Sequence, residues 1–266
     1  MSKTKIAQQL GVARSTLYYQ SRLALKDEQL RQDILQILHL HPSYGYRRLA
    51  IHLGVNKKRA LRVMQLYGIK PYRRRGKKPV YTKAPSLADA ELPNLIADYF
   101  PIAPNDVWAS DFTYIPYEGR FIYVATILDL YSRQVVGWHV SNRHDTALVA
   151  AAFYDALEHH GRPRILHSDR GSEYLSQIYM ELATNCGIKL SHSAKAHPWE
   201  NGYQESFYDG FKVDLGDPSR FVSVGQLTEA IHLQLYVYNH YRIHLALKMA
   251  PKQYLAKQVQ LTAVSL

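Results

Sequence analysis

The stretch ILHSDRGSEY, residues 165–174, joins the end of an apolar segment to a run of polar residues. Ile165 and Leu166 are typical of a buried strand, and Asp169 follows before the turn-forming pair Arg170–Gly171. A charge at the tip of a core strand is costly unless a cation or hydrogen-bond donors pair with it. Asp169 therefore needs a partner from elsewhere in the chain.

The sequence on both sides of this stretch predicts a mixed α/β fold. Strands are predicted at residues 105–116, 120–132, 133–141, 164–168 and 188–193, and helices at 146–160, 172–187 and 200–215. Turn residues near Glu118–Gly119 and Ser132–Arg133 favour an antiparallel meander of the first three strands. Asp145 is placed to cap the first helix, which Gly161 ends. Three strands followed by alternating helices and strands indicate a mixed sheet covered by helices.

The N-terminal third of the chain differs sharply in charge from the rest. Residues 1–80 hold 18 Lys/Arg and 3 Asp/Glu, whereas the remaining residues hold 15 and 19. The net charge of +11 therefore comes entirely from this third. Such an asymmetry indicates a polyanionic partner, and nucleic acid is the leading candidate. A basic surface that serves only solubility is the alternative.

Two short helical patterns lie within this basic third. Residues 4–20 turn at Gly11, and residues 44–69 turn at Gly54, each in the manner of a helix-turn-helix or of a plain helical hairpin. Residues 26–40 predict an amphipathic helix between them. The second pattern carries six cations that could contact phosphates or form a solvated face: Arg47, Arg48, Lys57, Lys58, Arg59 and Arg62.

The expected organisation has four parts. Residues 1–25 form a helix-turn-helix, 26–75 a second helical DNA-binding region, 76–103 a linker, and 104–266 the α/β core with C-terminal helices. The segment of residues 71–94, which leads from the second region into this linker and is rich in proline and cations at first, could follow a phosphate backbone. The candidate contacts in it are Arg73, Arg74 and Arg75.

The composition also limits the setting of the protein. The single cysteine, Cys186, excludes an intrachain disulfide and a cysteine-based zinc cluster. No apolar run is long enough for a membrane span, and no secretory signal pattern opens the chain. A cytoplasmic, nucleoid-associated location without membrane contact is therefore expected.

Three carboxylates are candidates for one site. Asp111 lies in the first predicted strand, Asp169 ends the fourth, and Glu205 lies in the last predicted helix. Neighbouring strands can align Asp111 and Asp169, and a helix over the sheet end can bring Glu205 to them. Carboxylates at one point repel unless cations lie between them, and hard oxygen ligands suit Mg²⁺ or Mn²⁺. Asp129 and Glu173 are competing carboxylates in the same part of the sequence.

The second half of the chain resembles the catalytic core of the D-D-E transposases and retroviral-type integrases. The motifs are WASDFTYI, ILDLYSRQVVGW, HSDRGSEY, HPWENGYQESF and YNHYRIHLAL, and 35 residues separate Asp169 from Glu205. Within that superfamily the chain is most similar to the OrfB-type transposases of insertion sequences. The resemblance covers residues 30–256, and the motifs are specific only in combination. It implies a ribonuclease H-like core that cleaves the ends of an insertion element and joins their 3′-hydroxyls to DNA.

The resemblance also implies roles for particular residues and partners. Asp111, Asp169 and Glu205 match a metal-binding catalytic triad that takes two Mg²⁺ or Mn²⁺ ions. Lys212, two helical turns after Glu205, matches a cation that contacts the element end. Trp199 and Asn201 precede the last helix in a loop that could order over the site. Relatives act as homo-oligomers on double-stranded DNA, and some act with a first-frame partner protein or as a frameshift fusion.

Two other functions are compatible with the same residues. A ribonuclease H-like nuclease would use the same triad for hydrolysis without joining. A DNA-binding regulator with an inactive core would need only the basic third of the chain. Metal-dependent strand joining separates the first two functions from each other, and DNA binding without any chemistry would indicate the regulator.

Overall fold

The structure is a computed structural model, and it describes residues 2–18, 23–72, 92–193 and 202–264. The chain divides into two compact units. Residues 1–40 and 45–70 form the helical unit, and residues 41–44 and 71–266 form the α/β unit. Within the described ranges, no helix combines the length and the apolar character that crossing a membrane requires.

The helical unit contains four α-helices and a short 3-10 helix among its described residues. They are α1 (Lys3–Gln9), a 3-10 helix (Arg14–Tyr18), α2 (Leu23–Leu40), α3 (Tyr46–His52) and α4 (Lys57–Leu66). Leu30 and Ile34 of α2 and Val63 of α4 are buried, as an amphipathic pattern predicts. The second short helix expected after Gly11 is a five-residue 3-10 helix, Arg14–Tyr18.

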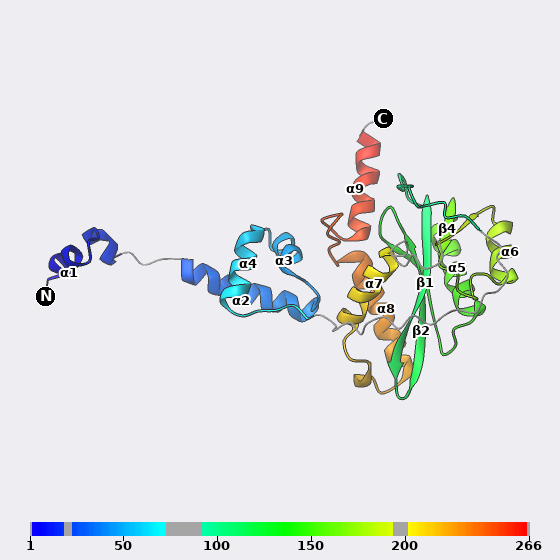
Figure 1. Cartoon of the computed structure of the whole chain (residues 1–266), viewed down its shortest axis with the longest axis horizontal. Coiled ribbons are helices and arrows are strands. Elements are labelled where there is room, and N and C mark those ends of the chain that lie inside the picture. The colour runs from blue at the N-terminus through cyan, green and yellow to red at the C-terminus, as the bar shows by residue number, and fades with distance from the viewer. Residues whose placement is uncertain (1, 19–22, 73–91, 194–201, 265–266) are drawn as a thin grey trace. The chain divides into compact units, whose positions relative to one another are not determined.

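The α/β unit is built on one five-stranded sheet with the strand order β3-β2-β1-β4-β5 (Figure 1). The strands are β1 (Val107–Tyr117), β2 (Arg120–Asp129), β3 (Val135–Ser141), β4 (Ile165–Ser168) and β5 (Lys189–His192). The first three strands pair antiparallel, whereas β4 pairs with β1 and β5 pairs with β4, both in parallel. The predicted meander and mixed sheet are therefore confirmed.

Turn residues in the left-handed region set the meander. Glu118 and Gly119 have φ values of 47° and 74° in the β1–β2 turn, and Arg133 has a φ of 63° between β2 and β3. The buried Asp129 supports the second turn, because its Oδ1 accepts hydrogen bonds from both the backbone N–H and the hydroxyl of Ser132 (2.6 Å each). Its burial is thus compensated by donors from the turn itself.

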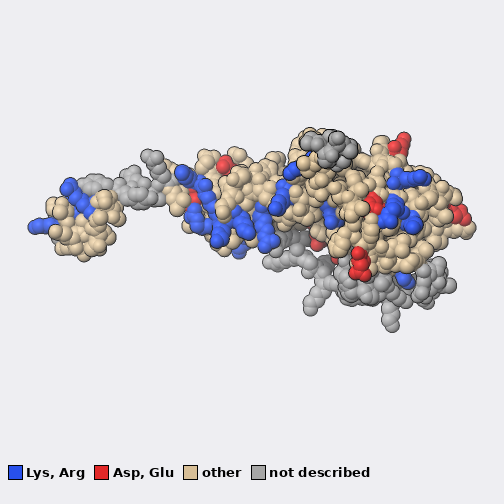
Figure 2. Space-filling model, turned by 90° about the horizontal axis from the view of Figure 1, so that it is seen from above, with Lys and Arg blue, Asp and Glu red and all other residues tan. Residues whose placement is uncertain are grey.

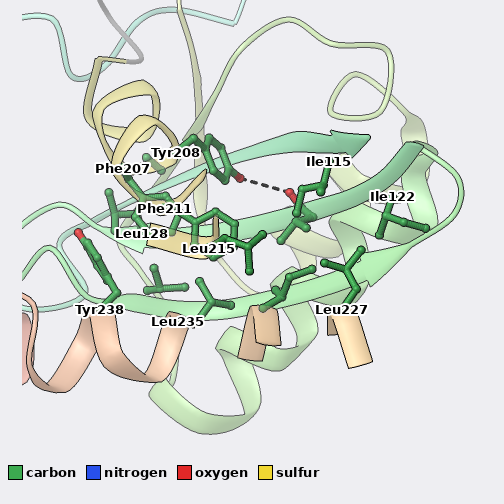
Figure 3. Packing of buried hydrophobic residues seen from close by; sticks show 14 of the residues in the cluster. Ile115, Ile122, Leu128, Phe207, Tyr208, Phe211, Leu215, Leu227, Leu235 and Tyr238 are labelled. Atoms are coloured by element: carbon green, nitrogen blue, oxygen red, sulfur yellow. Dashed lines mark hydrogen bonds between the residues drawn. The ribbon is translucent and has the colours of Figure 1, made fainter. Parts of the chain in front are cut away.

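Helices cover both faces of the sheet. The helices of this unit are α5 (Thr146–His160), α6 (Gln177–Asn185), α7 (Gly202–Leu215), a 3-10 helix (Pro218–Arg220), α8 (Val224–His240) and α9 (Pro251–Val264). Side chains of β1 alternate between the faces. Val107 and Ala109 pack in a cluster with α7 and α8, whereas Trp108 packs with α5 and α6. Figure 3 shows the first cluster, with Phe207, Tyr208 and Phe211 of α7 directed at the sheet.

Candidate active site

The parallel pairing of β1 with β4 aligns the first two carboxylates. Val107 pairs with Ile165, and the register continues to Ala109 and His167. The same offset, extended by two residues, brings Asp111 level with Asp169. Because side chains alternate along a strand, Asp111 follows Val107 and Ala109 on the sheet face on which α7 packs, whereas Asp169 lies just after the end of β4. The sequence prediction that these two strands are neighbours is correct.

Asp111 lies beside the buried hydroxyl groups of Tyr174 and Tyr208. Its Oδ1 accepts the backbone N–H of Phe112 (2.8 Å). Burial raises the pKa of Tyr174 well above its ordinary value, and the negative charges of Asp111 and Asp169 add to that rise. Burial followed by the charge of Asp111 likewise raises the pKa of Tyr208. Both phenols therefore stay neutral, and each can act as a hydrogen-bond donor near the carboxylates.

Asp169 lies in a tight turn after β4. Its Oδ1 accepts the N–H of Gly171 (2.9 Å). Asp169 as a whole residue is exposed to solvent. The surrounding protein nevertheless desolvates its carboxyl group and so raises the pKa of Asp169 above the ordinary value, and the negative charge of Glu173 raises that pKa further. A Cβ on Gly171 would lie 3.1 Å from Asp169 Oδ1 and 3.0 Å from Glu173 Oε2. Glycine suits position 171 because a side chain there would crowd the carboxylates of Asp169 and Glu173.

Two buried side chains fasten the first turns of α7 to the sheet. Gln204 Nε2 donates to the carbonyl oxygen of Ala109 (2.6 Å), and the Tyr208 hydroxyl donates to that of Asp111 (2.7 Å). Gln204 is fully buried, so the loss of these bonds would leave polar groups of the sheet without partners. Glu205 lies between the two anchors in sequence and has an exposed side chain at the N-terminal turn of α7.

Lys212 lies further along the same helix. Its Nζ is 5.0 Å from the ring centroid of Tyr114 in β1. A cavity of about 700 Å³ opens beside this pair, and Tyr117 and Pro218 contribute to its wall. The helix therefore carries a carboxylate at its start and a cation beside an aromatic ring two turns later.

The three carboxylates do not close around one point in the described part of the chain. No group of three His, Cys, Asp or Glu side chains gathers there at metal-binding distance. Asp111 lies two residues beyond the part of β1 that pairs with β4, Asp169 lies directly after β4, and Glu205 lies in the first turn of α7, which begins at Gly202. Trp199 and Asn201 lie outside the described residues, as do Arg73, Arg74 and Arg75.

The other polar residues of the motif have structural partners. His167 is buried, with Nδ1 2.9 Å from Ser191 Oγ and Nε2 3.0 Å from Ser193 Oγ. Arg170 Nε donates to the carbonyl oxygen of Ser193 (3.1 Å). Glu173 Oε1 lies 2.9 Å from Nδ1 of His144. The sequence did not predict this contact.

The cations of the helical unit fall into two groups. Arg62 Nη2 lies 2.6 and 2.7 Å from the two carboxylate oxygens of the buried Asp27, and Arg59 Nη2 donates to the carbonyl oxygen of Lys26 (3.0 Å). These two arginines therefore tie α4 to α2. Lys57 and Lys58 are exposed in the first turn of α4.

The remaining two cations lie on α3. Arg47 is exposed, with Nε 3.2 Å from the Tyr46 hydroxyl, and Arg48 is half-buried. Figure 2 shows Lys and Arg side chains gathered over the region of α2, α3 and α4.

Comparison with known proteins identifies the family. The Integrase core domain family matches residues 101–198, and a second Integrase core domain family matches residues 186–251. The transposase for insertion sequence element IS904 of Lactococcus lactis is 33% identical over 246 residues, which cover 88% of this chain and 96% of that protein. The chain belongs to the insertion-sequence transposases.

Two further transposases support this assignment. Putative transposase InsK of element IS150 from Escherichia coli is 28% identical, over 91% of this chain and 89% of its own. Transposase InsF of IS3A from Escherichia coli is 33% identical, and the match covers 68% of this chain and 65% of InsF.

A solved structure agrees on the fold. A chain in the cryo-EM structure of the simian T-cell lymphotropic virus intasome in complex with PP2A regulatory subunit B56 gamma has a TM-score of 0.52. It shares 18% sequence identity with this transposase, over 79% of this chain and 70% of that chain. The transposase core is thus a ribonuclease H-like mixed sheet.

Some features of the site have only weak signals in the sequence. Gln204 precedes Glu205 directly, and Tyr208 follows Gln204 by four residues, so both belong to one helix face. That spacing could have indicated two anchors beside the candidate catalytic residue Glu205. The pair His144 and Glu173 has no such signal, because 28 residues lie between them and only the tertiary fold brings them together.

Proposed function

We propose that this transposase cleaves the ends of its insertion element and joins the freed 3′-hydroxyls to target DNA by metal-dependent phosphoryl transfer. The observation that carries the proposal is the parallel register of β1 and β4, which supports Asp111 and Asp169 as a facing pair of ligands. The membership of the chain in the insertion-sequence transposases supports the choice of reaction.

The residues present suit a hard divalent cation. Asp111, Asp169 and Glu205 offer only oxygen ligands, which Mg²⁺ and Mn²⁺ prefer, and His167 has both ring nitrogens occupied by serine hydroxyls. We infer that Asp111 and Asp169 hold the metal and that Glu205 completes the set. Two bound ions would activate the attacking oxygen and stabilise the leaving oxygen of an in-line displacement.

The protein residues have supporting tasks in this reaction. Gln204 and Tyr208 hold α7 on the sheet and so fix the position from which Glu205 approaches. The Gly171 N–H orients the Asp169 carboxylate. Lys212 follows Glu205 on the same helix, and it could contact a phosphate near the cleaved bond. The role of Trp199 and Asn201 in closing the site stays a prediction.

The basic third of the chain is proposed to hold duplex DNA. The cations of α3 and the start of α4 would contact phosphates, and α3 and α4 with the turn at Gly54 would form a helix-turn-helix. Arg59 and Arg62 would support that arrangement through Asp27 rather than bind phosphates themselves. The domain division of the sequence prediction, a homo-oligomer on paired ends, a first-frame partner and a nucleoid location also stay predictions.

An assay with labelled duplexes that carry the element ends tests this function. Incubation with Mg²⁺ should give products in which one end is joined to another DNA. Cleavage without joining would favour the nuclease instead. DNA binding without cleavage, with Mn²⁺ and the first-frame partner also present, would favour a regulator.

A further inference from the structure

A buried carboxylate outside the proposed triad, Glu173, lies next to the candidate metal ligand Asp169. Its side chain is only 9% exposed. A Cβ added at Gly171 would lie 3.0 Å from Glu173 Oε2 and 3.1 Å from Asp169 Oδ1, so the two carboxylates flank one position of the size of a methyl group. Burial raises the pKa of Asp169, and the charge of Glu173 raises it further. Whatever binds Glu173 is therefore close to the proposed metal site.

His144 is the partner of this buried carboxylate. Its Nδ1 lies 2.9 Å from Glu173 Oε1, while the hydroxyl of Ser172 donates to Oε2 (3.2 Å). Because a carboxylate oxygen accepts hydrogen bonds, Nδ1 of His144 is the donor of the pair. His144 directly precedes Asp145, the N-cap of α5, so the pair fastens the start of that helix to the turn after β4.

The outer edge of the same imidazole ring is open. The side chain of His144 is 56% exposed, and Nε2 makes no hydrogen bond to any residue in the described part of the chain. The rings of Phe112 and Tyr123 flank it, with centroids 6.1 and 4.9 Å from the His144 centroid. A ring fixed by a carboxylate and by two aromatic neighbours is preorganised, so little conformational freedom is lost when Nε2 takes a ligand.

The charges around Nε2 favour an anionic ligand. A ligand oxygen at Nε2 would place the ring between that oxygen and Glu173, and two anions favour the doubly protonated ring, in which both nitrogens donate. Arg143, exposed directly before His144, adds a second cation at this place. The anion that the proposed reaction brings to Asp169 is the phosphate backbone of DNA, and charge-assisted bonds to phosphate are among the stronger hydrogen bonds.

We propose that His144 binds, through Nε2, a backbone phosphate that neighbours the reacting phosphate of the DNA strand. The inference rests on the proposed function and adds a substrate-binding residue to it. Glu173 acts through His144 and is a positioning residue. The bonds that form and break in the reaction are unchanged, because the contacted phosphate does not react. The contact would fix the register of the strand at the carboxylates.

Binding of chemically modified duplexes without divalent metal tests the proposal. One labelled duplex with the element end is unmodified, and each of the others carries a single uncharged methylphosphonate at a different phosphate near the cleaved bond. His144→Asn keeps an amide at the place of Nδ1, which can still donate to Glu173, but it lacks the Nε2 edge. It should bind the unmodified duplex about tenfold more weakly than the original protein, the loss of one hydrogen bond to a charged group.

The modified duplexes locate the contact. With the methylphosphonate at the contacted phosphate, the original protein and His144→Asn should bind equally, because the interaction is already absent. At every other position the tenfold difference should persist. His144→Gln, whose longer side chain carries its amide to the place of Nε2, should recover part of the affinity for the unmodified duplex and lose it again with the same single methylphosphonate.

A matched control is His159→Asn in the last turn of α5. The side chain of His159 is 61% exposed, and its Nδ1 also lies beside a carboxylate, 3.2 Å from Asp155 Oδ1. This variant should bind every duplex as the original protein does. Fluorescence anisotropy measures all the affinities, and circular dichroism should show the same folded spectrum for the original protein and the variants.

Two results would overturn the proposal. Unchanged affinity of His144→Asn for the unmodified duplex would leave His144 as the partner of Glu173 alone. An equal loss on every duplex in both His144 variants would mean that the substitutions act on the fold and not on one phosphate.

These outcomes are independent of the proposed chemistry, because no metal and no joining are needed. A protein that shows the contact at one phosphate but joins no DNA would retain the role of His144 and contradict the transposition reaction. A protein that joins DNA but shows no such contact would do the reverse.

Discussion

At the scale of single residues, Asp169 combines a proposed role in metal binding with a cost to the stability of the fold. Its pKa in the folded protein is raised by the surrounding protein and by Glu173. The stability that this group contributes is therefore fully present below the pKa of the unfolded chain and is lost as the pH rises through the folded pKa. At neutral pH the ionised carboxylate should destabilise the metal-free protein.

Asp169→Asn removes that charge and keeps the shape of the side chain. In the absence of divalent metal, the variant should unfold at a higher temperature than the original protein at pH 7, and the difference should shrink as the pH falls toward 4. Mg²⁺ should raise the midpoint of the original protein more than that of the variant. Thermal unfolding followed by circular dichroism measures both effects, and a variant that is less stable at pH 7 would contradict them.

Tyr208 offers a second test at this scale. Tyr208→Phe removes a hydroxyl that donates to the Asp111 carbonyl, and Tyr238→Phe removes one that donates to the Arg133 carbonyl. Each change should lower the free energy of unfolding by about 1 kcal/mol. Only the first should reduce strand joining beyond that loss, because only Tyr208 contacts the strand of Asp111. Equal joining activity in both variants, measured per folded protein, would remove Tyr208 from the supporting set.

At the scale of elements, the contact of β3 with α5 depends on Gly137. A Cβ there would lie 2.6 Å from the Cβ of Ala156 and would also overlap the carbonyl oxygen of Ala152. Gly137→Ala should therefore lower the free energy of unfolding by about 1–3 kcal/mol through overpacking. Gly225→Ala, in the first turn of α8 with ordinary contact distances, is the control and should be neutral or slightly stabilising. Urea denaturation compares the two, and equal midpoints would refute the packing argument.

The sequence predicted most elements of the α/β unit, because their signals are local. Asp145 accepts the N–H of Leu148, Gly161 and Gly187 have positive φ values, and Glu118 and Gly119 form the first turn, all at expected positions. The register of β1 with β4, which supports the alignment of Asp111 with Asp169, could not be read in the same way. It depends on pairing between strands far apart in sequence, and an offset of one residue would have moved one carboxylate to the other face.

The helical unit was harder to predict for a similar reason. Arg59 and Arg62 have the pattern of surface cations, yet both contact α2 through Asp27 or Lys26. The partner lies 35 residues before Arg62, and nothing near Arg62 in the sequence signals that pairing. Residues 11–16 are exposed in the structure, so the apolar pattern of the sequence did not decide between an α-helix and a 3-10 helix.

At the scale of the whole molecule, the separation of charge predicts how affinity responds to salt. Lys57 and Lys58 are exposed in the first turn of α4, where cations oppose the helix dipole. Replacing both with Gln should thus not reduce stability, but it should weaken duplex binding. The slope of log affinity against log salt should decrease by about 0.9 for each lost phosphate contact. Fluorescence anisotropy at several salt concentrations measures the slope.

Arg62→Gln provides the comparison for that measurement. It removes the partner of the buried Asp27, so it should reduce stability while the salt slope of the folded protein changes little. A smaller salt dependence of duplex affinity in the Arg62 variant, together with an unchanged one in the Lys57/Lys58 variant, would contradict this account. It would assign the phosphate contact to Arg62 rather than to Lys57 and Lys58.

The most direct test of the account is strand joining by the Glu205→Gln variant. Labelled duplexes with the element ends are incubated with Mg²⁺ and with the original protein, the Glu205→Gln variant, or Glu229→Gln, which changes an exposed glutamate of α8. The account predicts joined products with the original protein and with Glu229→Gln, and none with Glu205→Gln, although all three bind the duplex equally. Joining that persists in Glu205→Gln would contradict the carboxylate site on β1, β4 and α7.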